Sequence, residues 1–145
     1  ITYTKANGSV TGEYIDGLVY TGGKSFTVDF GGYTITDNGE INDYLVYLKN
    51  QGEKDNEITF KNGTIAINTT AWAAITVGAN SATHKTTLNL DNMEVVNGNP
   101  NNANNQVIRT RNGATVNLNN ETVVTSNGTS YGVVAETGST VNINS

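Results

Sequence analysis

The chain has 145 residues, the size of one domain, and only 14% of them are charged, against about 25% in typical soluble domains. Eight basic and 13 acidic residues give a net charge of -5, which argues against a nucleic acid or an anionic membrane as partner. The absence of Cys and the single His exclude disulfides, thiol catalysis and histidine-rich metal sites. We therefore expect no metal and no cofactor.

The polar residues are mostly amides and hydroxyls, because the chain contains 23 Asn and 22 Thr. No stretch keeps the apolar spacing of an amphipathic helix over three turns, whereas β-branched residues and Asn-Gly pairs recur throughout. No apolar run reaches the length of about 18 residues that a membrane-spanning helix needs. The sequence thus predicts an all-β segment that does not insert into a membrane.

One short segment recurs five times, with starts 25 to 30 residues apart. Each copy alternates apolar and polar residues and ends in Gly, Asn or Ser, which predicts a strand followed by a tight turn. A period that tolerates insertions indicates a solenoid of stacked coils. The copies are Val28–Gly32, Ile58–Asn62, Leu88–Asn92, Val116–Asn120 and Val141–Ser145.

Two further types of strand-like piece accompany these copies. The second strands are Tyr33–Thr36, Thr64–Ile67, Met93–Val96 and Thr122–Thr125. The third strands are Leu18–Tyr20, Tyr44–Leu48, Trp72–Val77, Gln106–Thr110 and Tyr131–Ala135. Three strands in each turn of 25 to 30 residues predict a right-handed parallel β-helix of about five coils. We expect residues 1–145 to form a single domain of this kind.

Alternation along the first strands predicts which residues face the core. Leu90 and Leu118 are expected inside, in apolar columns, while Asn89 and Asn117 face solvent. At the following turn, Gly32 and three Asn residues fall at one equivalent position, where stacked amides can hydrogen-bond from coil to coil. The expected structural ladder consists of Asn62, Asn92 and Asn120.

The Asn turns and two Gly-x-Thr-Val-Asn segments, at residues 113–117 and 138–142, carry a family resemblance. Through them the chain resembles the right-handed parallel β-helix superfamily, which contains pectate-lyase-like enzymes, autotransporter passengers and other bacterial surface adhesins. It looks most like a passenger or surface-adhesin segment. The resemblance covers residues from about 18 to 145, and it implies an extracellular or cell-surface location.

Enzymes that cleave polysaccharides in that superfamily resemble one another in gathering acids, or calcium-binding acids with a basic residue, on one strand face. In this chain the acids are scattered over the repeat. The densest groups are Asp37, Glu40 and Asp43, followed by Glu53, Asp55 and Glu57. Both groups lie in loop-like stretches, where solvated acids are the simpler interpretation, and calcium binding or catalysis is the alternative.

The basic residues do not complete a catalytic site either. Arg109 and Arg111 alternate onto one face of a third strand, where we expect them to anchor a loop or contact a ligand. His84 is expected in an exposed loop. We therefore assign no catalytic residue.

Aromatic residues concentrate on or beside the third strands. They can form a strip that binds sugar rings or a protein ligand, or an internal stack that covers the edge of the core. The loop Asn97–Asn105 contains Pro100 and six Asn in nine residues, and it is expected to be a solvent-facing recognition loop. The candidate ligand-binding residues are Trp72, Tyr131, Tyr44, Arg109, Asn99 and Asn102.

Our leading expectation is a non-enzymatic adhesin or stalk segment that presents a polar face and loops to glycans or proteins. A fragment of a β-helical polysaccharide lyase or glycoside hydrolase is the first alternative, and a purely structural spacer is the second. The last residues form a first strand whose earlier copies all continue into a second strand. Further coils of a longer solenoid are therefore expected as partners.

Overall fold

The structure is a computed structural model, and it describes residues 16–37, 39, 41–68, 71–79, 82–99, 105–127 and 129–144. All regular elements in these residues are β-strands, which confirms the predicted all-β class. No helix in these ranges is long and apolar enough to cross a membrane. The strands are β1 (Leu18–Tyr20), β2 (Phe26–Asp29), β3 (Thr34–Thr36), β4 (Tyr44–Leu48), β5 (Asn56–Ile67), β6 (Ala73–Val77), β7 (Thr86–Asn97), β8 (Gln106–Thr110), β9 (Thr115–Asn119), β10 (Val123–Ser126), β11 (Tyr131–Ala135) and β12 (Thr140–Ile143).

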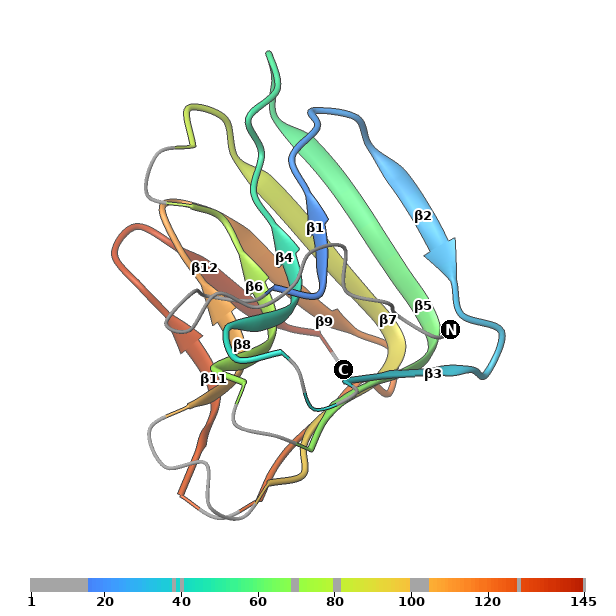
Figure 1. The fold of residues 1–145 in the computed structure, drawn as a ribbon. Coiled ribbons are helices and arrows are strands. Elements are labelled where there is room, and N and C mark those ends of the chain that lie inside the picture. The colour runs from blue at the N-terminus through green and yellow to red at the C-terminus, as the bar shows by residue number, and fades with distance from the viewer. Residues whose placement is uncertain are drawn as a thin grey trace.

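The strands stack as a parallel β-solenoid (Figure 1). One sheet has the order β1-β4-β6-β8-β11, and we call it the third-strand sheet. The other has the order β12-β9-β7-β5-β2, and β3 and β10 pair with the later halves of β5 and β7. Each strand therefore lies beside its counterpart one coil away, as the repeat predicts.

The solenoid makes about four turns, and the prediction of about five coils is too high by one. The five third strands, from β1 to β11, bound only four complete turns between them. The last coil contributes β12 but no second or third strand within the described residues. The sequence count was too high because it numbered repeat copies rather than the turns between them.

In the two middle coils the first and second strands are one continuous strand. β5 and β7 each run for 12 residues, bent at Asn62 and Asn92, whose φ angles are 57° and 52°. Asn is one of the few residues that tolerates this left-handed conformation, which turns the chain without ending its pairing. The predicted boundary between first and second strands is therefore a bend in these coils.

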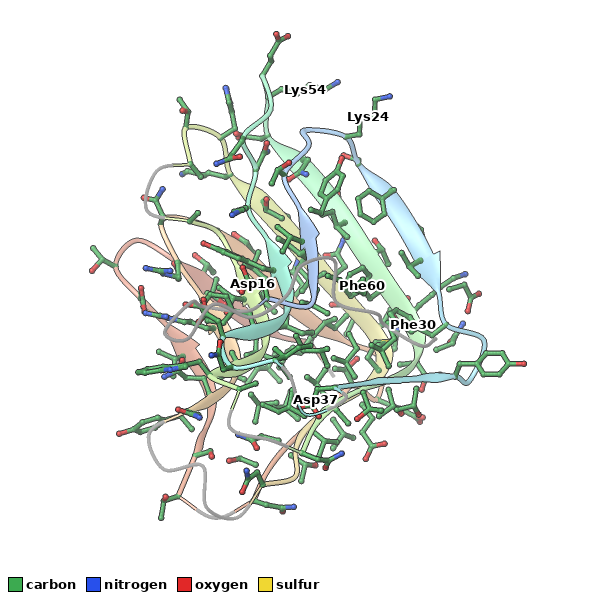
Figure 2. The ribbon with its side chains drawn as sticks, viewed as in Figure 1. Asp16, Lys24, Phe30, Asp37, Lys54 and Phe60 are labelled. Atoms are coloured by element: carbon green, nitrogen blue, oxygen red, sulfur yellow. The ribbon has the colours of Figure 1, made fainter. Side chains whose placement is uncertain are left out.

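The first coil differs in register from the prediction. Val28 pairs with Phe60 rather than with Ile58, so β2 lies two residues away from its expected alignment. Four residues separate Asp29, the end of β2, from Thr34, the start of β3. Their partners on β5, Lys61 and Thr64, have only two residues between them. Gly32 therefore belongs to a longer turn and is not equivalent to Asn62. The insertion keeps Phe30 in the core, where its ring packs edge-on against Phe60 with 5.5 Å between centroids (Figure 2).

The core consists of apolar columns that run from coil to coil. Leu90 lies between Phe60 and Leu118 in neighbouring strands, and all three side chains are buried. Asn89 and Asn117, which alternate with them, are partly exposed on the outer face. The predicted inward and outward assignment is confirmed from β5 to β9. The inward side chains of one coil are covered by those of the neighbouring coils, while the outer face stays polar.

One buried hydroxyl in these columns lacks a hydrogen bond. Thr110 lies between Val77 and Ala135, it is fully buried, and its Oγ1 has no partner. We expect Thr110→Val to raise the free energy of unfolding by about 1 kcal/mol, because the isosteric methyl group has no hydrogen bond to lose. Urea unfolding of the purified chain measures the change.

The matched control is Thr122→Val. The Thr122 hydroxyl donates to the Leu90 carbonyl at 3.0 Å and accepts the Met93 N–H at 3.2 Å. The same substitution there should lower stability by about 1 to 3 kcal/mol, since it leaves both backbone groups without that partner. Equal losses at Thr110 and Thr122 would mean that the Thr110 hydroxyl has a hydrogen-bond partner in solution.

Candidate functional site

Asparagine side chains hydrogen-bond between coils at the bend. Asn92 Nδ2 donates to Asn62 Oδ1 at 3.1 Å, and Asn62 Nδ2 donates to Asp29 Oδ1 at 3.2 Å. Asn120 Nδ2 donates to Asp91 rather than to Asn92. The turn of Asn120 contains one more residue than the bend at Asn92. The Asn120 amide therefore lies against Asp91, the residue before Asn92. These bonds give the bend a structural role.

A second set of amides follows the outer face. Asn142 donates to Asn117 at 2.8 Å, Asn117 donates to Asn89 at 2.7 Å, and Asn89 donates to Glu57 at 2.6 Å. The sequence predicts that these positions face solvent, but it does not reveal that their amides are joined. The bonds hold adjacent strands in register, so most of the Asn-rich surface is explained by stability of the solenoid.

The two groups of acids that are close in the sequence make separate contacts in the structure. Asp37 accepts the backbone N–H of Asn68 at 3.2 Å, and Glu40 lies outside the described residues. Asp55 accepts the Lys85 N–H at 2.9 Å and lies 3.5 Å from the His84 ring nitrogen. No group of three or more His, Cys, Asp or Glu that could hold a metal ion occurs in the described part of the chain.

Arg109 and Arg111 converge on one carboxylate of the next coil. Arg109 Nε donates to Glu136 Oε1 at 2.6 Å, and its Nη2 pairs with the same oxygen. Arg111 Nε donates to Glu136 Oε2 at 3.2 Å. The shared face predicted for the two arginines brings them together, and Glu136 fixes their guanidinium groups.

A hollow of about 310 Å³ lies on the third-strand sheet. It is lined by Asp43, Tyr44, Trp72 and Arg109. We call it the aromatic hollow. Three of its four lining residues are candidate ligand-binding residues of the sequence analysis. The fourth, Asp43, belongs to a group of acids that the sequence left with two interpretations.

The stacking of coils explains why these residues meet. Asp43 and Trp72 directly precede β4 and β6, which are paired neighbours. The backbone N–H of Trp72 donates to the Asp43 carbonyl at 2.7 Å, which fixes the two strand starts against each other. Arg109 comes from β8, one coil further on, and its Nη1 donates to the Tyr44 hydroxyl at 2.9 Å. Three successive coils thus contribute side chains to one surface.

Asp43 is the ionisable group most perturbed by this arrangement. Partial burial, followed by the neighbouring Asp16 carboxylate, raises its pKa to about 6. A hydrogen bond from Tyr44 and the charges of Arg109 and Arg111 act in the opposite direction but are weaker. Burial also raises the pKa of Asp16, whose carboxylate accepts the Tyr44 N–H at 3.3 Å. Asp43 therefore takes up a proton well above the usual pH range of a carboxylic acid.

The predicted aromatic strip is not continuous. Trp72 is 45% exposed at the aromatic hollow, and Tyr44 packs edge-on against Tyr47 with 4.9 Å between ring centroids. Tyr20 instead packs against Phe26 beside the core. Tyr131 is 54% exposed at the start of β11 but does not line the aromatic hollow.

Of the two candidate loop residues, Asn99 and Asn102, the structure describes only Asn99. The backbone N–H of Asn99 donates to the Asn97 side chain at 3.2 Å, just after β7. Asn102 lies outside the described residues, as does the middle of the predicted recognition loop. Asn99 is not among the described residues that line the aromatic hollow.

The sequence analysis missed Asp16, although a signal for it exists. Asp-x-Leu-Val-Tyr occurs twice, at residues 16–20 and 43–47, so an Asp precedes both strands. The strands pair with a one-residue shift from this motif alignment, since Leu18 lies opposite Val46. A shift of one residue exchanges the two faces of a strand, which explains why Tyr20 packs inside while Tyr47 does not.

Comparison with known proteins adds no family to this description. No family model matches the chain. No curated protein and no solved structure gives a significant match either. The functional argument therefore rests on the geometry of the aromatic hollow.

Proposed function

We propose that this chain is a glycan-binding segment of an extracellular or cell-surface β-solenoid, an adhesin-like module that binds its ligand without converting it. The observation that carries the proposal is the aromatic hollow, which combines the exposed Trp72 ring with the polar groups of Asp43, Tyr44 and Arg109. Ligand sites typically pair an apolar surface with a few convergent polar groups that fix orientation. Sugar rings match this combination, because they have an apolar face of C–H groups and an edge of hydroxyls.

The resemblance of the Asn turns and the Gly-x-Thr-Val-Asn segments to passenger and adhesin segments supports the extracellular assignment. Further coils are part of the proposal as partners: β11 and β12 are edge strands, and the Ile143 side chain on β12 is exposed. Edge strands with exposed apolar residues recruit additional strands. A protein ligand is the alternative occupant of the aromatic hollow, and a pure spacer would have no ligand there.

One observation favours the enzymatic alternative, a polysaccharide lyase or glycoside hydrolase fragment. Asp43 has a raised pKa of about 6 beside the carboxyl group of Asp16, and perturbed acids in hollows are frequent in active sites. However, glycosidases separate their two carboxyl groups by about 5 to 10 Å to accommodate the reacting atoms. Asp43 is the one carboxylate among the described residues that line the aromatic hollow, so these residues do not supply such a pair.

The proposed function is tested by replacing Trp72 with Ala and measuring binding on an array of neutral and acidic glycans. We expect binding by the unchanged chain and a loss of about tenfold or more for Trp72→Ala. The control is Tyr33→Ala, which removes another highly exposed aromatic ring that does not line the aromatic hollow and should leave binding unchanged. Equal losses in both variants, or release of shortened sugars from a bound polysaccharide, would contradict the proposal.

A further inference from the structure

We propose that the aromatic hollow selects uncharged sugars and discriminates against uronic and sialic acids. The inference rests on the proposed glycan-binding function and specifies its ligand class. It follows from which polar groups in the aromatic hollow are already engaged within the protein and which remain available to a ligand.

The guanidinium group of Arg109 is already paired with a carboxylate of the protein, that of Glu136. Bidentate recognition of a carboxylate uses two parallel N–H groups of one guanidinium. In Arg109 the side-on pair, Nε and Nη2, is occupied by Glu136. Nη1 donates to the Tyr44 hydroxyl. Arg109 thus offers a ligand one N–H group each on Nη1 and Nη2, which can donate to sugar oxygens. An acidic sugar would have to share the Arg109 charge with Glu136, which already pairs with it.

The carboxylate of Asp43 makes the aromatic hollow unfavourable for an anion. An ionised carboxylate accepts hydrogen bonds only, and sugar hydroxyls are donors that form charge-assisted bonds with it. The acidic group of a uronic or sialic acid would instead meet a like charge close by. With Asp43 as acceptor and Arg109 as donor lining the same aromatic hollow, two neighbouring hydroxyls of a neutral sugar satisfy both groups.

The surrounding charges do not reverse this preference. Asp43 is influenced by the carboxylate of Asp16, by Arg109 and Arg111, and by the hydroxyl of Tyr44. Both arginines are held by Glu136, and the charge of Lys49 acts on Asp16. Three carboxylates therefore accompany three cations around the aromatic hollow, so no excess of positive charge attracts an acidic sugar.

The protonation of Asp43 gives the two ligand classes opposite pH dependence. Above about pH 6 Asp43 is ionised and accepts hydroxyls, and below it the carboxyl group is protonated and neutral. A neutral sugar that uses the ionised form should bind up to about tenfold more weakly at pH 5 than at pH 7.5. An acidic sugar should bind more tightly at pH 5, because the like charge has been removed.

The experiment is calorimetric titration of the full chain with cellohexaose, xylohexaose and mannopentaose as neutral probes, and with hexagalacturonate and sialyllactose as acidic probes, at pH 7.5 and pH 5. We expect at least one neutral probe to bind at pH 7.5 with a Trp72-dependent affinity at least tenfold above that of either acidic probe. That affinity should fall at pH 5. Asp43→Asn should abolish the pH dependence. Asp16→Asn should move its midpoint to lower pH, because it removes the negative charge that raises the pKa of Asp43.

Three outcomes would overturn the inference, and they separate it from the proposed function. Tighter Trp72-dependent binding of an acidic probe would refute the neutral preference while leaving a glycan-binding aromatic hollow. Binding of a neutral probe with a pH dependence that survives in Asp43→Asn would remove Asp43 from the site. Absence of binding by every probe would contradict the glycan-binding function and the inference with it.

Discussion

Replacing Gly78 with Ala is expected to lower the free energy of unfolding by about 4 kcal/mol, because two unfavourable effects coincide there. Gly78 follows β6 and has a φ angle of +87°, a conformation that costs an L-residue about 1 to 2 kcal/mol. A Cβ atom would also overlap the carbonyl oxygen of Arg111 and lie 3.0 Å from its carbonyl carbon. Since the obstacle is the backbone of the next coil, no rotamer change can relieve the overlap.

Two other glycines separate the contributions. Gly32 has a φ angle of +83° but has no atom within 4 Å of the added Cβ, so Gly32→Ala should cost only the conformational part, about 1 to 2 kcal/mol. Gly132 in β11 has neither a positive φ nor a neighbour at that distance. Gly132→Ala should be neutral or stabilising by up to about 1 kcal/mol. Thermal and urea unfolding of the three variants give the comparison, and a Gly78→Ala loss no larger than that of Gly32→Ala would contradict the close stacking of these coils.

The close approach at Gly78 also bears on function. The backbone N–H of Gly78 donates to the Leu48 carbonyl at 2.8 Å, and the N–H of Arg111 donates to the Val77 carbonyl at 2.8 Å. The segment Val77–Gly78 thus joins the ends of three neighbouring third strands, β4, β6 and β8. Arg111 and Arg109 reach Glu136 from this end of the sheet. A displaced coil at Gly78 would therefore disturb the guanidinium group of Arg109, which lines the aromatic hollow.

The strands of this protein can be predicted from its sequence because alternation and turn residues repeat together. Five copies of an alternating segment are difficult to explain except by stacked coils, and the positions of Leu90 and Leu118 follow directly from them. The period does not reveal local insertions. The longer turn around Gly32 moves Val28 opposite Phe60, although the starts of the copies at Val28 and Ile58 are spaced like those of the next pair.

The aromatic hollow could be predicted in composition but not in geometry. Tyr44, Trp72 and Arg109 all lie on or beside third strands, so the sequence places them on one sheet. Tyr44 and Arg109 are 65 residues apart, and their contact depends on the offset between coils, which composition and period do not fix. The partnership of Asp16 with Asp43 depends on the one-residue shift between β1 and β4. Such offsets are set by packing, and only the structure supplies them.

The second large effect is expected for Leu90→Ala, with a loss of about 2 to 5 kcal/mol in the free energy of unfolding. Leu90 is fully buried in the middle of an apolar column. Its neighbours along the column, Phe60 and Leu118, belong to paired strands on either side. They cannot move into the vacated space without breaking the hydrogen bonds of their own strands. The cavity therefore persists, and its cost adds to the lost burial of the side chain.

The matched control is Thr87→Ala on the same strand, three residues earlier. Thr87 alternates onto the outer face, opposite Glu57 and Thr115, and its removal should change stability by less than about 0.5 kcal/mol. Urea unfolding with unchanged slopes would show that both variants unfold from the same native state. If the two substitutions cost the same, the assignment of Leu90 to the inner face and Thr87 to the outer face would be contradicted. The assignment of the apolar column would then be wrong, and with it the register of the coils that brings the residues of the aromatic hollow together.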